Sequence, residues 1–596
     1  MLRGLLAKFG RQAAAPDAKN AARAAADGRH DATAAELSAQ GVRQRLRGEY
    51  ADAQRSLVRA IELEHDCAEA HHNLGLVYLD QGHAEDAVDC LHLAIHFSPR
   101  LAPAYASLGA ALLALRRYEA AEAACRQALA LEPASAVTWL HLGNVLKARG
   151  ELAPATAAYR AALERDAANA DAACQLAFVL FRLGQYAESY QAYAMLLAGQ
   201  PDFAEAHHNL GLLQLETGYP AEALQSFQRA LTLKPGTLET RTCIAHALRD
   251  LGQLDAAIQA YDAVLAQRPQ FGDAVINRCY ALLMRGDYVA GWAAYEQRFA
   301  ATETPLRDFG VPAWRGEPLR ETCVLVFAEQ GLGDEIMFAS CVPDLLAVAG
   351  HCVIECNPRL AGLFARSFTP ATVRGADKNE DRDWVSALPQ LDYQTPIGSL
   401  PAHFRRARVD FPARGGYLMA DPARIEGWRR ILDTPGKPVR IGIAWRGGTL
   451  RNRQLLRSTQ LADWIPVIGQ REFEFVSLQY GDCKAELLEL RDRHHVAVRE
   501  AGDAASNLDE LAAVISALDL VISVDNTVAH LAGALGQPLW VLLPFSAEWR
   551  YPHSGNATPW YPSARLFRQV QPRDWIPVMQ QVAHSLRTDF AACSTA

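Results

Sequence analysis

One turn near the C-terminal end combines polar side chains with the expected start of a helix. It lies between two almost wholly apolar runs, Leu518–Ser523 and Leu539–Leu543, which predict parallel strands buried on both faces. The polar residues of the turn are Asp525, Asn526, Thr527 and His530. Asp, Asn and Thr favour helix N-termini, where free N–H groups and the positive dipole end attract phosphate. The turn therefore fits the diphosphate or monophosphate of a nucleotide leaving group.

A second loop could also bind an anion. It follows the apolar run Val439–Trp445 and opens with Gly447 and Gly448. Its arginines are Arg446, Arg451, Arg453 and Arg457. The planar guanidinium group binds phosphate or carboxylate through two parallel hydrogen bonds, so the loop predicts a clamp for a diphosphate or a sugar-acid carboxylate. The alternative is an exposed basic loop without a function.

The third polar turn comes after the expected strand Thr322–Phe327. Gly331 and Gly333 allow the backbone to turn tightly and to approach a ligand, and Asp334 is expected to cap a helix that runs through Ala347. Ligands collect at the carboxyl ends of strands in open parallel sheets, which favours a binding role for this turn. The alternative is that the acids here only cap the helix.

These turns belong to an expected α/β region of two Rossmann-like lobes. A Pro- and Gly-rich linker at 306–320 leads into a first lobe at 321–435, and a second, nucleotide-sugar-binding lobe covers 436–590. Alternation of buried strands with helices predicts a parallel sheet in each lobe.

The first half of the chain is a repeat. Small residues recur every 34 positions from Gly41, a second small position follows after twelve residues, and a bulky position follows four residues later. This period and pattern predict an α-solenoid of eight tetratricopeptide (TPR) repeats at 34–305, which serves peptide or protein binding.

One position per repeat is expected to face the concave groove of this solenoid. The polar residues proposed there to hold an acceptor are Asn73, His141, Gln175, Asn209 and Asn277. The series resembles the asparagine ladder of the TPR-bearing O-linked N-acetylglucosamine transferases, which clamps an extended polypeptide. The alternative is that asparagine is simply common at this position of the repeat.

Composition excludes some classes of protein. A formal net charge of -8 over 596 residues argues against binding to nucleic acid. The 12 cysteines form no CxxC pair, which indicates reduced thiols and a cytoplasmic protein. No apolar run is long enough to cross a membrane. Residues 1–33 are expected to be a poorly ordered leader; the alternative is an amphipathic segment that touches a membrane surface.

Several segments resemble the bacterial heptosyltransferases, which have the GT-B fold. These segments are AEQGLGDEIMFAS, GIAWRGG, SVDNTVAHLAGALGQPLWVLLP and PWYPSARLFRQ. With the repeats, the chain is similar to TPR-bearing protein O-glycosyltransferases that modify flagellin. The resemblance implies that Asp334, with Glu335 beside it, is catalytic, that the turn at Asp525 holds the donor nucleotide, and that no metal or other cofactor is needed.

The resulting hypothesis is a glycosyltransferase that moves a sugar from a nucleotide donor to a Ser or Thr hydroxyl of a protein recruited by the repeats. Flagellin and a CMP-linked nonulosonic acid are the expected acceptor and donor. Three alternatives stay open: a heptosyltransferase-like enzyme of lipopolysaccharide assembly, a non-catalytic scaffold with a decayed GT-B domain, and a pure TPR adaptor.

Overall fold

The computed structural model describes residues 32–302, 305–377, 383–388, 390–436, 439–447 and 453–590. The chain divides into two compact units, Met1–Leu210 and Gly211–Ala596. The division falls inside a helix, α13 (Ala204–Glu216), so the last repeats belong to the same unit as the sheets. The expected leader lies outside the described residues, apart from positions 32 and 33.

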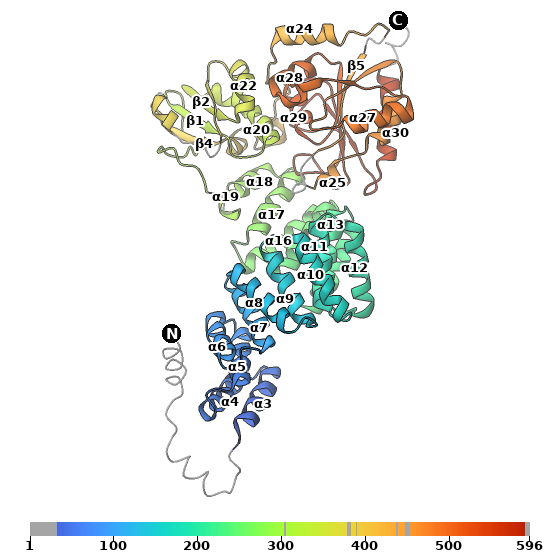
Figure 1. Ribbon diagram of the computed structural model, residues 1–596. Helices are drawn as coiled ribbons and strands as arrows, with labels where there is room; N and C mark the ends of the chain where they lie inside the picture. Colours follow the sequence, from blue (N-terminus) through green and yellow to red (C-terminus); the bar gives the residue numbers. More distant parts are fainter. Residues whose placement is uncertain are drawn as a thin grey trace. The chain divides into compact units, whose positions relative to one another are not determined.

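Pairs of helices build the first unit, as the 34-residue period predicts (Figure 1). The first helix of each pair has 13 residues and the second has 14. In chain order the helices are α3 (Ala34–Leu46), α4 (Tyr50–Leu63), α5 (Ala68–Asp80), α6 (Ala84–Phe97), α7 (Ala102–Ala114), α8 (Tyr118–Leu131), α9 (Ala136–Ala148), α10 (Leu152–Arg165), α11 (Ala170–Arg182) and α12 (Tyr186–Gly199). The predicted α-solenoid is confirmed.

The recurring glycines explain the spacing. A Cβ added at Gly41 would lie 2.6 Å from the side chain of Leu57, and one added at Gly143 would lie 2.5 Å from the ring of Tyr159. Each small residue of a first helix thus faces the bulky residue 16 positions later in the second helix. The close approach of the two helices leaves no room for a methyl group.

Replacing Gly143 by alanine is therefore expected to lower the free energy of unfolding of the first unit by about 1–3 kcal/mol. The control is Gly199→Ala in α12, where an added Cβ would meet nothing within 4 Å; this change should be neutral or stabilise by up to about 1 kcal/mol. Chemical denaturation of both variants measures the difference. Equal stabilities would contradict this account of the packing.

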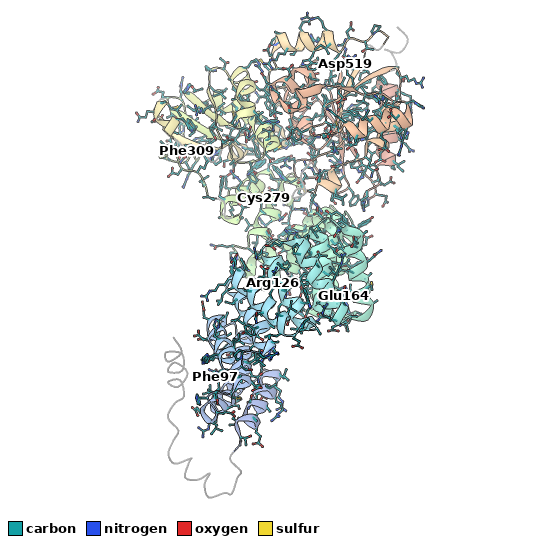
Figure 2. The ribbon with its side chains drawn as sticks, viewed as in Figure 1. Phe97, Arg126, Glu164, Cys279, Phe309 and Asp519 are labelled. Carbon is teal, nitrogen blue, oxygen red and sulfur yellow. The ribbon has the colours of Figure 1, made fainter. Side chains whose placement is uncertain are left out.

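The second unit begins with the remaining repeat helices. They are α14 (Pro220–Leu233), α15 (Leu238–Asp250), α16 (Leu254–Gln267), α17 (Gly272–Arg285), α18 (Tyr288–Tyr295) and the short α19 (Arg298–Ala301). Figure 2 labels Cys279 of α17, whose buried thiol donates to the backbone oxygen of Gly291 in α18 at 3.2 Å. This contact repeats the close packing of small positions seen in the first unit.

The first sheet is parallel and has the strand order β3-β2-β1-β4. Its strands are β1 (Cys323–Phe327), β2 (His351–Cys356), β3 (Thr372–Gly375) and β4 (Tyr393–Pro396), with helices α20 (Leu332–Phe338), α21 (Val342–Leu346), α22 (Ala361–Ser367) and α23 (Pro401–Phe404). The single helix expected through Ala347 is wrong, because a 3₁₀ turn at 339–341 separates α20 from α21. Pro343 lacks a backbone N–H and stands in the first turn of α21, where a helix tolerates it.

The second sheet is also parallel, with the order β10-β9-β8-β5-β6-β7. Its strands are β5 (Val439–Ala444), β6 (Phe473–Ser477), β7 (Arg499–Glu500), β8 (Leu520–Val524), β9 (Leu539–Leu543) and β10 (Ala564–Arg568). Its helices are α24 (Pro422–Ile431), α25 (Gln454–Arg457), α26 (Ile465–Ile468), α27 (Lys484–His494), α28 (Leu508–Ser516), α29 (Thr527–Ala534) and α30 (Ile576–Asp589). The predicted α/β class of the C-terminal region is confirmed.

The strand order reverses between β5 and β8, because the chain leaves β5 towards β6 on one side and adds β8 on the other. The carboxylate of Asp519, which is labelled in Figure 2, accepts a hydrogen bond from the Arg440 N–H at 2.7 Å and so joins the starts of β5 and β8. Ligands of open parallel sheets bind at such a reversal, outside the carboxyl ends of the strands. Two of the predicted polar turns follow these two strands.

The Pro- and Gly-rich segment predicted as a linker packs along the first sheet. The backbone N–H of Trp314 donates to the backbone oxygen of Gln394 in β4 at 2.8 Å. The backbone N–H of Phe309, a residue that Figure 2 labels, donates to the Gln394 side chain at 2.9 Å. The segment therefore continues the edge of the sheet instead of hanging free. The other domain limits predicted from the sequence stay predictions.

Side chains of the last repeats contact three loops of this unit. Buried Arg298 pairs with Glu329 at the end of β1, and its Nε lies 2.9 Å from the Glu329 carboxylate. Arg453, from the loop after β5, pairs with Asp250 at the end of α15. The ring of Trp549 stacks on Tyr280 of α17 with centroids 5.4 Å apart. Three loops near the carboxyl ends of strands thus have partners on repeat helices.

The described cysteines are free thiols, and all but Cys67 are buried. Burial raises the pKa of Cys125 and of Cys174 to about 12, so both thiols stay protonated at neutral pH. Within the described part of the chain, no helix has the length and apolar character needed to cross a membrane.

Candidate active site

The turn after β1 places Asp334 on a cavity. α20 begins at Leu332 and its N-cap is Gly331, so the expectation that Asp334 caps the helix is wrong. Asp334 lies in the first turn, and its Oδ1 accepts from Arg550 Nε at 2.7 Å and Nη2 at 2.6 Å. Because Gly331 is the N-cap, the Asp334 carboxylate does not cap the helix and instead pairs with Arg550 from the region of the second sheet.

Glu335 points elsewhere. It is 1% exposed, and its Oε2 accepts from the backbone N–H of Asn357 just after β2 at 2.9 Å. The carboxylate therefore joins two neighbouring strand ends of the first sheet and does not line the cavity. Its predicted catalytic role stays a prediction.

Asn526 is the N-cap of α29. Its Oδ1 accepts from the backbone N–H groups of Val528 at 2.9 Å and Ala529 at 3.2 Å, and its Nδ2 donates to the backbone oxygen of Arg446 at 3.0 Å. The expectation that these helix N–H groups are free for phosphate is corrected, because the Asn526 side chain already satisfies two of them. Asn526 also joins the ends of β5 and β8.

Asp525 is buried and is not among the residues that line the cavity. It is 1% exposed, its Oδ2 is 3.2 Å from Arg457 Nη2, and its Oδ1 accepts from the Tyr551 hydroxyl at 3.2 Å. Arg457 also donates to the backbone oxygen of Asp525 at 2.7 Å. The pair holds the loop after β5 against the turn after β8.

His530 is neutral and packs against the turn after β1. Burial, reinforced by the positive charge of Arg550, lowers the pKa of His530 to about 3. Its Nδ1 lies 2.8 Å from the Tyr561 hydroxyl, and a Cβ added at Gly333 would lie 2.9 Å from its ring. Glycine at 333 is therefore what lets α20 approach α29 (Figure 1).

The predicted arginines have different surroundings. Arg446 donates to the backbone oxygen of Asp482 at 2.9 Å and pairs with Glu486 at 3.1 Å. Arg453 turns away to Asp250 and to the backbone oxygen of Leu215, which lies 3.1 Å from its Nη2. Arg451 lies outside the described residues.

Most of the predicted site residues in the α/β region line one cavity of about 580 Å³. The predicted residues that line it are Gly331, Gly333, Asp334, Arg446, Arg457, Asn526, Thr527 and His530. Asp334 and His530, which come from turns of different sheets, both line it. Within the described ranges, no group of three or more His, Cys, Asp and Glu side chains is placed to hold a metal ion.

Sequence reasoning did not assign several further lining residues, among them Arg359, Gln479, Tyr480 and Arg550. Gln479 and Tyr480 directly follow β6, and Arg359 follows β2. Because ligands of open parallel sheets bind at the carboxyl ends of strands, the positions of these residues would have indicated them. Arg550 lies in the loop between β9 and β10. Its partner Asp334 is 216 residues away, and no local pattern signals that contact.

In the repeats, residues at the expected ladder positions already have partners inside the solenoid. Asn73 donates to Ser38 at 3.4 Å, and the His141 ring nitrogen lies 3.1 Å from the backbone oxygen of Ala106. The others behave alike: Gln175 donates to Glu205, Asn209 to Cys174 and Asn277 to the backbone oxygen of Asp273. Most of these bonds connect one repeat to the next. Acceptor binding by these residues stays a prediction.

Models of known protein families match segments of both the repeats and the C-terminal α/β region. Tetratricopeptide repeat models match residues 43–82, 68–100, 102–135, 174–236 and 244–303. The model described as glycosyltransferase family 9 (heptosyltransferase) matches residues 503–570, which include α28, β8, α29, β9 and β10.

Protein FlbA of Caulobacter vibrioides is 34% identical to the chain over 329 residues, 53% of this chain and 55% of FlbA. The chain thus spans about half the length of this curated relative. The APC/C hetero-tetramer Cut9-Hcn1 is 16% identical, with 43% of this chain and 51% of that chain covered and a TM-score of 0.38. The TPR protein YrrB is 21% identical, with 31% and 95% covered and a TM-score of 0.26.

The chain is therefore similar to tetratricopeptide repeat proteins between residues 43 and 303, and to the glycosyltransferase family 9 (heptosyltransferase) model over residues 503–570.

Proposed function

We propose that the protein is a glycosyltransferase that moves a sugar from a nucleotide-sugar donor to a Ser or Thr hydroxyl of a protein. The repeats recruit this acceptor, and the α/β region binds the donor. The match of residues 503–570 to glycosyltransferase family 9 and the two parallel sheets support the proposal, including its GT-B form.

One observation carries the proposal. A single cavity brings the turn after β1 together with the loops after β5, β6 and β8, so that Asp334 of one sheet and Thr527 and His530 of the other face the same space. A donor bound at the strand reversal of the second sheet would present its sugar towards Asp334. A carboxylate in that position can accept the proton of the attacking hydroxyl.

The other lining groups suit a departing phosphate. Arg359, Arg446, Arg457 and Arg550 line the cavity, and preorganised cations stabilise the charge that develops on a leaving group. Neutral His530 can offer a hydrogen bond without adding charge. In this proposal the arginine side chains neutralise the departing phosphate, and no cofactor is required.

The finer form of the proposal names a CMP-linked nonulosonic acid as donor, flagellin as acceptor and the cytoplasm as the location. The similarity to flagellin-modifying transferases supports it. The second candidate, a heptosyltransferase-like enzyme of lipopolysaccharide assembly, draws support from the description of the matching family. The repeats favour a protein acceptor, because a lipid-linked sugar needs no peptide groove.

A thermal-shift screen of the full chain with CMP, UDP, GDP and ADP tests donor binding. A ligand that binds only the folded state stabilises it by RT ln(1 + [L]/Kd), so the nucleotide of the true donor should raise the melting temperature most. Transfer of labelled sugar from the matching nucleotide sugar to purified flagellin or to lipopolysaccharide then separates the two candidates. If none of the four nucleotides binds, the proposal fails.

Tyr480 is expected to stack on the base of the nucleotide. It is 64% exposed and lines the cavity, and the neighbouring Gln479 side chain fixes its loop by accepting from the backbone N–H groups of Trp445 at 2.9 Å and Arg446 at 2.8 Å. Tyr480→Ala should weaken nucleotide binding by about 1–3 kcal/mol, as loss of base–aromatic stacking does elsewhere. Tyr480→Phe keeps the ring and is the control, and equal affinities of the two variants in calorimetric titration would contradict the stacking.

A further inference from the structure

The proposed base is engaged in an ion pair. Two nitrogens of Arg550, Nε and Nη2, lie 2.7 and 2.6 Å from the same oxygen of Asp334, and the side chains are only 16% and 14% exposed. A carboxylate held this closely by a guanidinium is poorly placed to accept a proton from an incoming hydroxyl. The proposed reaction therefore needs Asp334 to be released.

Arg550 is also part of a longer series of charges. Its Nη1 lies 3.8 Å from Glu548, Glu548 lies 3.9 Å from Arg457, and Arg457 pairs with Asp525 at 3.2 Å. Burial alone would lower the pKa of Arg550, but Asp334, Glu548 and Asp525 outweigh it and raise the pKa. Arg550 is therefore charged, and its charge is already balanced by carboxylates.

An anionic ligand must compete with those carboxylates. The guanidinium fork of Arg550 faces the cavity and matches the oxygens of a phosphate, which carries more negative charge than a carboxylate. The stacking of neighbouring Trp549 on Tyr280 fixes the backbone beside Arg550. A change of partner then needs only the side chain of Arg550 to rotate.

We propose that Arg550 is a positioning residue that exchanges Asp334 for the phosphate of the bound nucleotide, so that donor binding itself frees the Asp334 carboxylate. This inference depends on the proposed function. It predicts an unusual result: removing the charge of Asp334 should tighten nucleotide binding, because the phosphate no longer competes for Arg550.

The test is calorimetric titration of the full chain with CMP, UDP, GDP and ADP. We expect Asp334→Asn to bind the preferred nucleotide about fivefold or more tightly than the natural chain, the lower range of measured couplings between sites. Arg550→Gln should weaken binding, and Arg550→Lys should restore part of it. In the Arg550→Gln background, Asp334→Asn should change the affinity by less than about twofold, because the competition is gone.

A purely structural ion pair gives a different result. It would let Asp334→Asn lower the melting temperature without any gain in affinity, and this outcome would overturn the exchange. A gain that persists without Arg550 would overturn it as well. Asp344→Asn is the control, since Asp344 pairs with Arg414 at 2.9 Å and does not line the cavity. If no nucleotide binds the natural chain, the proposed function itself fails, whereas binding without the predicted gain overturns only the exchange.

Discussion

Replacing Asp334 by asparagine is expected to slow sugar transfer by about 10²–10⁴-fold, the range that a positioned general base contributes. Asparagine keeps the size of the side chain but cannot accept the proton of the acceptor hydroxyl. The loss should appear in kcat, while the nucleotide still binds. Steady-state transfer assays together with nucleotide titration measure both effects.

Glu335→Gln is the matched control for this prediction. Glu335 is the next residue, but its carboxylate accepts from the Asn357 N–H and does not reach the cavity. A glutamine oxygen can accept the same hydrogen bond, so the transfer rate should change little. If Glu335→Gln stops transfer and Asp334→Asn does not, the two acids have been assigned the wrong roles.

Replacing Asp250 by alanine is expected to destabilise the second unit by about 3–5 kcal/mol, as loss of one partner of a buried ion pair does. The Asp250 side chain is 4% exposed and pairs with Arg453 and with Arg249, whose Nη2 lies 3.0 Å away. Both guanidinium groups would be left without this carboxylate. Because Arg453 precedes α25, which carries Arg457 to the cavity, nucleotide binding should weaken as well.

The control for this change is Asp255→Ala on the following helix. Asp255 is 80% exposed and pairs with Arg285 at 2.8 Å, so its loss should change the free energy of unfolding by no more than about 1 kcal/mol. Urea denaturation compares the two variants. A difference of less than about 1 kcal/mol between them would contradict a stabilising role for the buried pair.

The same pair predicts a dependence on pH. Burial raises the pKa of Asp250, but Arg453 and Arg249 outweigh burial and hold the pKa at about 2, below its ordinary value of 3.8. The folded state therefore binds this proton more weakly than the unfolded state does. The Asp250 carboxylate therefore contributes fully to the free energy of unfolding above about pH 4, and this contribution is lost as the pH falls towards about 2. Asp250→Ala should remove this part of the pH dependence, which urea denaturation at a series of pH values measures.

Periodic and local features of the fold could be predicted from the sequence. The 34-residue period reflects contacts such as that of Gly143 with Tyr159, 16 residues apart in one repeat. The buried strand β9 begins and ends where its apolar run, Leu539–Leu543, does. Polar turns after strands led to Asp334, Asn526 and His530, since strand ends in a parallel sheet meet at one edge.

Contacts between distant segments could not be predicted. Arg453 was interpreted as a donor clamp, but its partner Asp250 stands 203 residues earlier on a repeat helix. The pairing of Arg550 with Asp334 joins the two sheets. At Asn526 the residue type indicated a helix cap, but whether such a side chain leaves the helix N–H groups free depends on its rotamer, which local sequence does not determine.

The division of the chain inside α13 bears on how such proteins diversify. The unit that begins at Gly211 keeps its own last repeats, including the helices that carry Asp250 and Arg298. When recombination exchanges repeats between related genes, a crossover before Gly211 would therefore leave the ion pairs of the second unit intact. A crossover placed at the junction of repeats and sheets, near residue 305, would separate Arg298 from Glu329 and Asp250 from Arg453.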